Sequence, residues 1–140
     1  MRIIRVRDPD DPRLLPFTAL PRRGEGGATI VVEGEIAVAR ALASEHPVRA
    51  VLLTASHRAR LGVVIPAGVE VLEAEAALVR QVVGFDFHRG CVAVMDRPRT
   101  LSIEELAARV RAWPAGPRRV LVAEGLADPA NLGAVIRNAR

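Results

Sequence analysis

The sequence predicts an α/β protein whose main domain is a small α/β sandwich with a mainly parallel sheet. Short β-branched runs alternate with amphipathic segments between residues 29 and 95, in the order β-α-β-α-β-α-β. Half of the 140 residues are hydrophobic and 26% are charged, a balance that is typical of a soluble globular domain. The apolar runs are much shorter than the ~20 residues of a membrane span, and the amino terminus lacks the apolar core of a secretory signal.

Each element is assigned from its apolar spacing. Strands are expected at residues 1–6, 29–32, 49–54, 69–72 and 91–95, and helices at residues 36–43, 57–61 and 74–83. The first helix should place on one face Ile36, Ala39, Leu42 and Ala43. The third helix should turn inward Leu78, Val79, Val82 and Val83. We expect this domain to span residues 1–97, with an irregular extension at 1–27.

A composition shift after residue 97 indicates a linker and the beginning of a second domain. Residues 98–117 are predicted to be a linker with a helix, which begins at the capping box Ser102-x-x-Glu105 and ends before a Pro-Ala-Gly-Pro break. Residues 118–140 should form a strand at 119–123 and a helix capped by Asp128. A lone strand exposes unpaired N–H and C=O groups, so we expect it to pair with the first sheet or with a second copy of the chain.

The charge inventory suggests an anionic partner. All 20 cations are arginines, against 16 acids, for a formal charge of +4. Arginine binds phosphate through a planar fork of donors, although codon usage in a GC-rich genome is an alternative cause of this bias. The candidate phosphate-binding side chains are Arg22, Arg23, Arg58, Arg60, His88 and Arg89. A solvated helix face remains the alternative for residues 57–60, and a structural turn for Arg89-Gly90.

Other classes of site are disfavoured. The three histidines are too scattered for a metal site, and the phosphate-loop and dinucleotide-loop patterns are missing. Cys91 is the only cysteine, which excludes an internal disulfide and fits a small buried residue in a reducing cytoplasm. Aromatic residues are too few, at 3%, for a base-stacking platform.

The most specific pattern lies at residues 128–139, which read DPxNxGxxxRxA after an apolar run. It resembles the first motif of the SpoU/TrmH-type RNA 2′-O-ribose methyltransferases, of the SPOUT class. Upstream, Val32-Glu-Gly-Glu35 before an Ala/Leu helix and His88-Arg-Gly-Cys91 before a strand resemble the same family's amino-terminal substrate-binding domain. The resemblance covers residues 27–140.

The resemblance implies properties that composition does not show. The first domain should resemble kink-turn-binding ribosomal proteins and bind structured RNA, either rRNA or tRNA. The second should be the first β-α unit of a knotted SPOUT domain, which binds S-adenosylmethionine, needs no metal and forms a homodimer. The matching motif places at the active site Asn131 and Arg137. The family's later motifs would follow Arg140, so we expect no cofactor-binding residue in this chain and no activity from it alone.

Two other classes of function remain open at this point. One is a non-catalytic RNA-binding module of the ribosomal-protein type. The other is an α/β domain that binds only protein, for which RNA affinity would be absent or insensitive to salt. In each case the sequence favours a cytoplasmic protein that does not bind a membrane.

Overall fold

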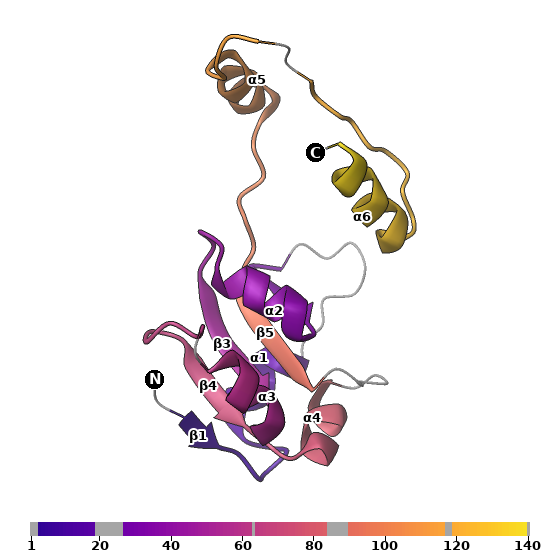
Figure 1. The fold of residues 1–140 in the computed structure, drawn as a ribbon. Helices are drawn as coiled ribbons and strands as arrows, with labels where there is room; N and C mark the ends of the chain where they lie inside the picture. Colours follow the sequence, from indigo (N-terminus) through magenta and orange to yellow (C-terminus); the bar gives the residue numbers. More distant parts are fainter. Residues whose placement is uncertain (1–2, 19–26, 63, 84–89, 117–118, 140) are drawn as a thin grey trace. The chain divides into compact units, whose positions relative to one another are not determined.

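The computed structural model describes residues 3–18, 27–62, 64–83, 90–116 and 119–139, in two compact units (Figure 1). The first unit is Met1–Arg99 and the second is Thr100–Arg140. Within the described residues, no helix is long and apolar enough to cross a membrane.

The first unit is built on one sheet of five strands in the order β1-β4-β3-β5-β2. These strands are β1 (Ile3–Arg5), β2 (Thr29–Glu33), β3 (Val48–Leu53), β4 (Glu70–Glu73) and β5 (Cys91–Asp96). The pairs β1·β4 and β3·β4 are parallel, whereas β5 is antiparallel to both β3 and β2. The sheet is therefore mixed, and the prediction of a mainly parallel sheet holds only for one side of it.

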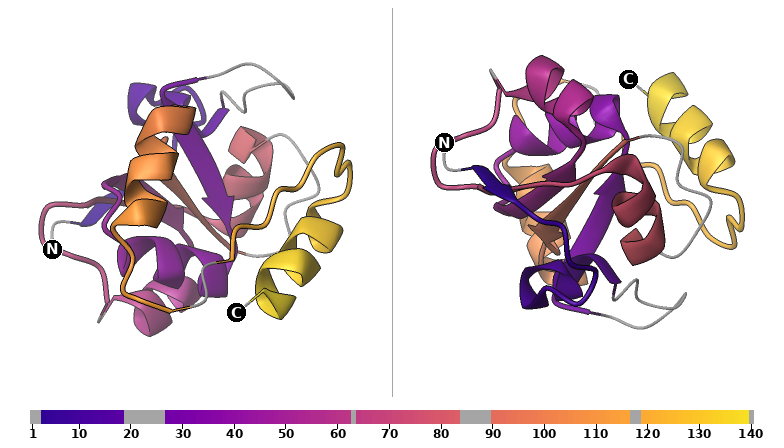
Figure 2. Two further views of the ribbon diagram at one scale, coloured as in Figure 1. Left: turned by 90° about the horizontal axis from the view of Figure 1, so that it is seen from above. Right: turned by 90° about the horizontal axis from the view of Figure 1, so that it is seen from below.

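Helices cover both faces of this sheet (Figure 2). The 3₁₀ helix η1 (Pro12–Leu14), α1 (Leu15–Thr18) and α4 (Ala76–Val83) pack on one face, and α2 (Glu35–Leu42) and α3 (Ala55–Leu61) pack on the other. Alternate strand residues divide between the two cores, because successive side chains of a strand point to opposite faces. Leu52 and Val92 face α4, whereas Val51 and Cys91 face α2.

The burial of individual side chains corrects two expectations. On α2 the buried residues are Val38, Ala41 and Leu42, and Ile36 is 72% exposed, so the predicted inward face was rotated. The strand expected at residues 1–6 is present as β1, but the following part of the segment 1–27, predicted to be irregular, contains the short helices that bury Leu14 and Phe17. The inward face of α4 and the burial of Cys91 are as predicted.

The second unit contains two capped helices. α5 (Ile103–Arg111) begins with the predicted capping box: the Glu105 amide donates to Ser102 Oγ at 3.2 Å, and the Ser102 amide donates to Glu105 Oε2 at 2.8 Å. α6 (Pro129–Asn138) begins after Asp128, whose Oδ1 accepts from the Ala130 amide at 2.8 Å.

The predicted strand at residues 119–123 is absent from the described second unit. Val120, Leu121 and Val122 are 52%, 62% and 86% exposed in an irregular segment, and they do not pair with the first unit's sheet. A strand gains its hydrogen bonds from a neighbouring strand, so β-branched composition without a partner does not produce one. Pairing with a second copy of the chain stays a prediction.

Candidate nucleic-acid interface

Most of the polar side chains that are candidates for ligand binding lie along one side of the sheet, where most of its strands end. β1, β2, β3 and β4 run in the same direction and β5 runs in the opposite one, so four strand ends and the start of β5 lie along this carboxyl edge. In sheets with parallel strands, the crevice outside the carboxyl ends is the usual place for a ligand.

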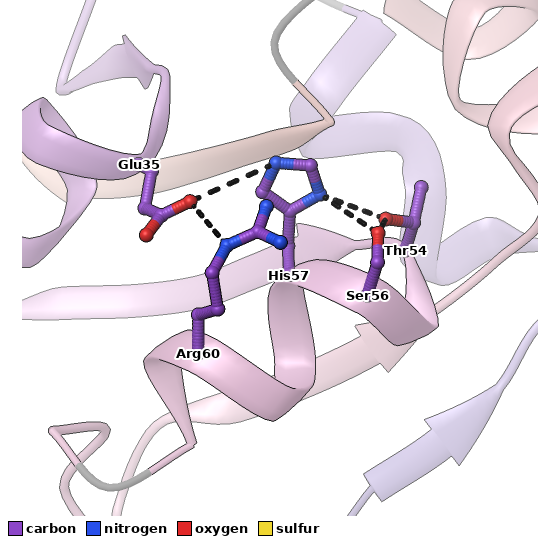
Figure 3. Close-up of polar contacts among 5 residues, drawn as sticks. All are labelled: Glu35, Thr54, Ser56, His57 and Arg60. Atoms are coloured by element: carbon purple, nitrogen blue, oxygen red, sulfur yellow. Dashed lines mark hydrogen bonds and ion pairs between the residues drawn. The ribbon is translucent and has the colours of Figure 1, made fainter.

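His57, in the first turns of α3, connects two elements at this edge (Figure 3). Its Nδ1 lies 2.8 Å from Thr54 Oγ1, and its Nε2 lies 3.9 Å from Glu35 Oε2 at the start of α2. Arg60 Nε donates to the same Glu35 oxygen at 2.7 Å. Burial, together with the nearby positive charge of Arg60, lowers the pKa of His57 below its ordinary value of 6.5, and Glu35 opposes this shift. The ring is therefore mostly neutral at pH 7.

Two glycines with positive φ shape the backbone around this histidine. Gly34, at φ 93°, donates from its amide to the Cys91 carbonyl at 3.0 Å. Gly90, at φ 65°, accepts at its carbonyl from the Thr54 amide at 3.1 Å. A Cβ on Gly90 would lie 1.9 Å from His57 Cε1. Within the described chain, the group that lies closest to this position is the His57 ring.

A surface groove opens beside this cluster. It is lined by Glu33, Gly34, Glu35, Ile36, Ala37, Arg40 and His57. Its two acids are offset by Arg40 and by Arg60, which is paired with Glu35. With balanced charges and the exposed Ile36 in its wall, the groove suits a polar, partly apolar group such as a nucleobase edge more than a phosphate.

A second pocket lies farther along the same edge, at the ends of β1, β3 and β4. It is lined by residues 5–7, 54–56 and 73–76. Glu73, 9% exposed, accepts from Arg5 Nε at 3.2 Å and from Arg58 Nε at 2.5 Å. One carboxylate thus holds two guanidinium groups at the pocket, which leaves the trio with a net positive charge.

The structure separates the predicted RNA-binding residues. Arg58 and Arg60 both lie on α3, but they pair with different acids, Glu73 and Glu35, which line different pockets. The other four predicted side chains lie outside the described residues: Arg22, Arg23, His88 and Arg89. Sequence reasoning missed Arg5, Glu35 and Glu73. Their position in the chain is the signal that could have found them: Arg5 and Glu73 each end a strand, and Glu35 begins α2 two residues after the end of β2.

The two predicted catalytic residues lie in the second unit. Asn131 and Arg137 are both exposed on α6. A Cβ at Gly133 would lie 3.2 Å from Arg137 Nη1, so the guanidinium folds back over the glycine one turn earlier. The glycine of the motif therefore leaves room for its arginine. The catalytic role of both residues stays a prediction.

Metal binding finds no support in the described residues, where no three His, Cys, Asp or Glu side chains are grouped to hold an ion. Burial also raises the pKa of the Cys91 thiol to about 11, which disfavours the thiolate that a nucleophile or metal ligand requires.

Comparison with known proteins identifies relatives of this chain, although no protein-family model matches it. It is 35% identical to an uncharacterized tRNA/rRNA methyltransferase of Mycobacterium tuberculosis, over 96% of this chain and 46% of that protein. The chain thus spans about half the length of the curated relatives it matches.

Solved structures agree with the sequence comparison. An RNA 2′-O ribose methyltransferase shares 25% identity with a TM-score of 0.59, over 97% of this chain and 51% of that one. An AdoMet-bound rRNA methyltransferase from Sinorhizobium meliloti, at 14% identity, a TM-score of 0.53 and coverage of 70% and 38%, supports the fold alone. The resemblance to RNA methyltransferases predicted from the motifs is confirmed.

Proposed function

We propose that this chain, a relative of the SpoU-type RNA methyltransferases, is the RNA-recognition part of an RNA 2′-O-ribose methyltransferase. The observation that carries the proposal is the similarity over 96% of the chain, because it includes both the sheet unit and the segment with DPxNxGxxxRxA. A module that only bound RNA or protein through its sheet would not need that segment.

In this proposal the first unit binds structured rRNA or tRNA along the carboxyl edge of its sheet. The groove beside His57 offers both hydrogen-bond donors and hydrogen-bond acceptors, and the exposed arginines along the carboxyl edge supply phosphate contacts. We assign phosphate contacts to Arg58 and Arg60, and also to the predicted Arg22, Arg23, His88 and Arg89. For Arg58 and Arg60, an RNA phosphate would bind beside the carboxylate that each arginine now binds.

The catalytic contribution of this chain is assigned to Asn131 and Arg137. A free guanidinium stays protonated, so Arg137 acts through its charge and donors, by stabilising the negative charge that develops on the ribose 2′-oxygen. Asn131 lies in the first turn of α6, where unpaired backbone donors favour an anionic group.

S-adenosylmethionine is the methyl donor that this relationship implies. The described residues 119–128 are irregular and exposed, and do not form an enclosing element for it by themselves. We therefore assign the cofactor site, and the contacts of a homodimer, to other parts of the whole protein.

The test measures RNA binding by the 140-residue chain. Fluorescence anisotropy with labelled tRNA and rRNA fragments should show affinity that falls steeply with salt, by a log–log slope near ~0.9 per phosphate neutralised on a duplex. Calorimetry should detect no S-adenosylmethionine binding to this chain. RNA affinity that is absent or insensitive to salt would reject the proposal, and micromolar cofactor binding would reject the division of roles.

A further inference from the structure

We infer that Arg5 and Arg58, positioned by Glu73, form a clamp for a backbone phosphate of the bound RNA. The inference rests on the proposed function and adds a specific contact site to it. It concerns the pocket at the ends of β1, β3 and β4, beside the His57 groove along the same edge.

The backbone holds the three side chains in register. Arg5 ends β1 and Glu73 ends β4, and the two residues are direct partners in the parallel ladder. Glu73 is likewise the partner of Leu53, the last residue of β3. The Val6 amide donates to the Glu73 carbonyl at 2.8 Å, so the turn out of β1 is also tied to this point. The carboxylate is thus fixed where the three strands end.

Each arginine donates one hydrogen bond to the Glu73 carboxylate. Both bind Glu73 through Nε, and among the described residues no other hydrogen bond is recorded for either guanidinium. The Arg5 side chain is 73% exposed and that of Arg58 is 38% exposed, whereas that of Glu73 is 11% exposed. The acid is covered and the remaining N–H donors of both arginines reach the surface, an arrangement suited to a tetrahedral anion.

Charge distinguishes this pocket from the groove. At the pocket, the lining residues Arg5 and Arg7, together with the Arg58 that pairs with Glu73, outnumber Glu73 and Glu75 by one positive charge. At the groove, Arg40 and the Arg60 that pairs with Glu35 only balance Glu33 and Glu35. A phosphate is therefore favoured at the pocket, which is also lined by Ser56, whose hydroxyl lies 3.0 Å from Thr54 Oγ1.

One substitution separates the clamp from a purely structural role of Arg5, Arg58 and Glu73. If the three residues only stabilise the fold, RNA is attracted by the overall positive charge of the surface. Glu73→Gln removes a negative charge next to the pocket and should then strengthen RNA binding. In the clamp, Glu73→Gln leaves one amide oxygen to orient two guanidinium groups, so RNA binding should weaken about three- to tenfold despite the added positive charge. Glu75→Gln is the matched control: it lies in the same exposed pocket, and the described residues give it no ion pair. It should strengthen binding slightly.

The arginines are tested in the same anisotropy assay with labelled tRNA. Arg5→Gln and Arg58→Gln should each weaken binding about three- to tenfold and lower the salt slope by about one phosphate equivalent. Arg49→Gln is the control, because Arg49 pairs with Asp96 at the opposite edge of the sheet. It should change affinity less than twofold. Arg5 is highly exposed, so its variant should fold even if another does not, as thermal melting will verify.

Three outcomes would overturn the clamp: equal strengthening by Glu73→Gln and Glu75→Gln, affinities unchanged by both arginine variants, or equal losses for Arg5, Arg58 and Arg49. If the wild-type chain binds no RNA, a titration with inorganic phosphate separates the two claims. Shifts of the Arg5 and Arg58 Nε resonances, lost in Arg5→Gln, would keep the phosphate site and reject the proposed function. No shift would reject both.

Discussion

At Gly90 the backbone conformation and a side-chain contact both oppose a larger residue. Its φ of 65° is costly for an L-residue, and a Cβ would lie 1.9 Å from the His57 ring. Gly90→Ala should therefore lower the free energy of unfolding by at least about 2 kcal/mol, measured by urea denaturation. Gly68→Ala is the control, since nothing lies within 4 Å of the added methyl group and its φ is not positive. A Gly90→Ala protein as stable as the control would contradict this account.

His57 should make stability depend on pH in the mildly acidic range. Its folded pKa lies below the ordinary 6.5 because burial and Arg60 disfavour the charged ring, more than Glu35 favours it. The unfolded chain therefore binds more protons near pH 6, and stability should fall as the pH is lowered from 6.5 towards the folded pKa. We expect this decline to be smaller in His57→Gln, with the free energy of unfolding measured at each pH. Identical pH profiles for the two proteins would argue against the shift.

On the scale of whole elements, α5 depends on its cap, because none of its described residues is buried. Ser102→Ala removes the acceptor of the Glu105 amide, and should cost that helix about 1 kcal/mol. Carbon chemical shifts should show fraying of the first turn of α5 with no change in α6. Asp128→Ala should have the converse effect, because Asp128 caps α6. Undiminished α5 helicity in Ser102→Ala would show that other contacts stabilise the helix.

The sequence predicted best those elements whose own residues specify them, through apolar spacing or a capping pair. The spacing of Leu78, Val79, Val82 and Val83 defined the inward face of α4, and the Ser102–Glu105 pair defined the start of α5. On α2 the alanine-rich sequence left two possible faces, and packing selected the one with Val38. The direction of β5 and the absent strand at 119–123 depend on neighbouring strands, which local composition does not encode.

The candidate site was less predictable than the elements for a similar reason. Clustered arginines on α3 indicated an anionic partner, but spacing along one helix did not reveal that Arg58 and Arg60 diverge to acids 15 and 25 residues away. Glu73 ends an otherwise ordinary strand, and its role depends on β1 lying beside β4. Only the strand order brings these charges together.

For the whole molecule, stability should reside in the first unit. Among the described residues, every buried side chain lies between Val6 and Met95, and the second unit has no buried side chain. A chain ending at Arg99 should therefore unfold within about 0.5 kcal/mol of the 140-residue protein. Chemical denaturation of both proteins measures this difference. A loss of several kcal/mol would mean that the second unit stabilises the first.

The proposed catalytic role requires the whole protein, and Arg137 is the residue of this chain through which that proposal can be tested. The experiment uses the protein extended by the segment that its relatives carry beyond the matched half. Arg137 is exposed on α6, so Arg137→Ala should leave the fold intact, which circular dichroism verifies. If the guanidinium stabilises the developing 2′-alkoxide, methyl transfer to RNA should fall roughly 10²–10³-fold, the usual effect of losing one transition-state donor.

Two further variants separate charge from geometry in that assay. Arg137→Lys should restore little activity, because a compact ammonium does not reproduce the planar fork. Asn131→Ala should also reduce turnover, in part through the first turn of α6. Affinity for the methyl donor should barely change in Arg137→Ala, since that pocket is assigned to other segments. Near-normal turnover by a folded Arg137→Ala enzyme would remove the catalytic assignment, and the proposed RNA contacts of the first unit would stand independently of it.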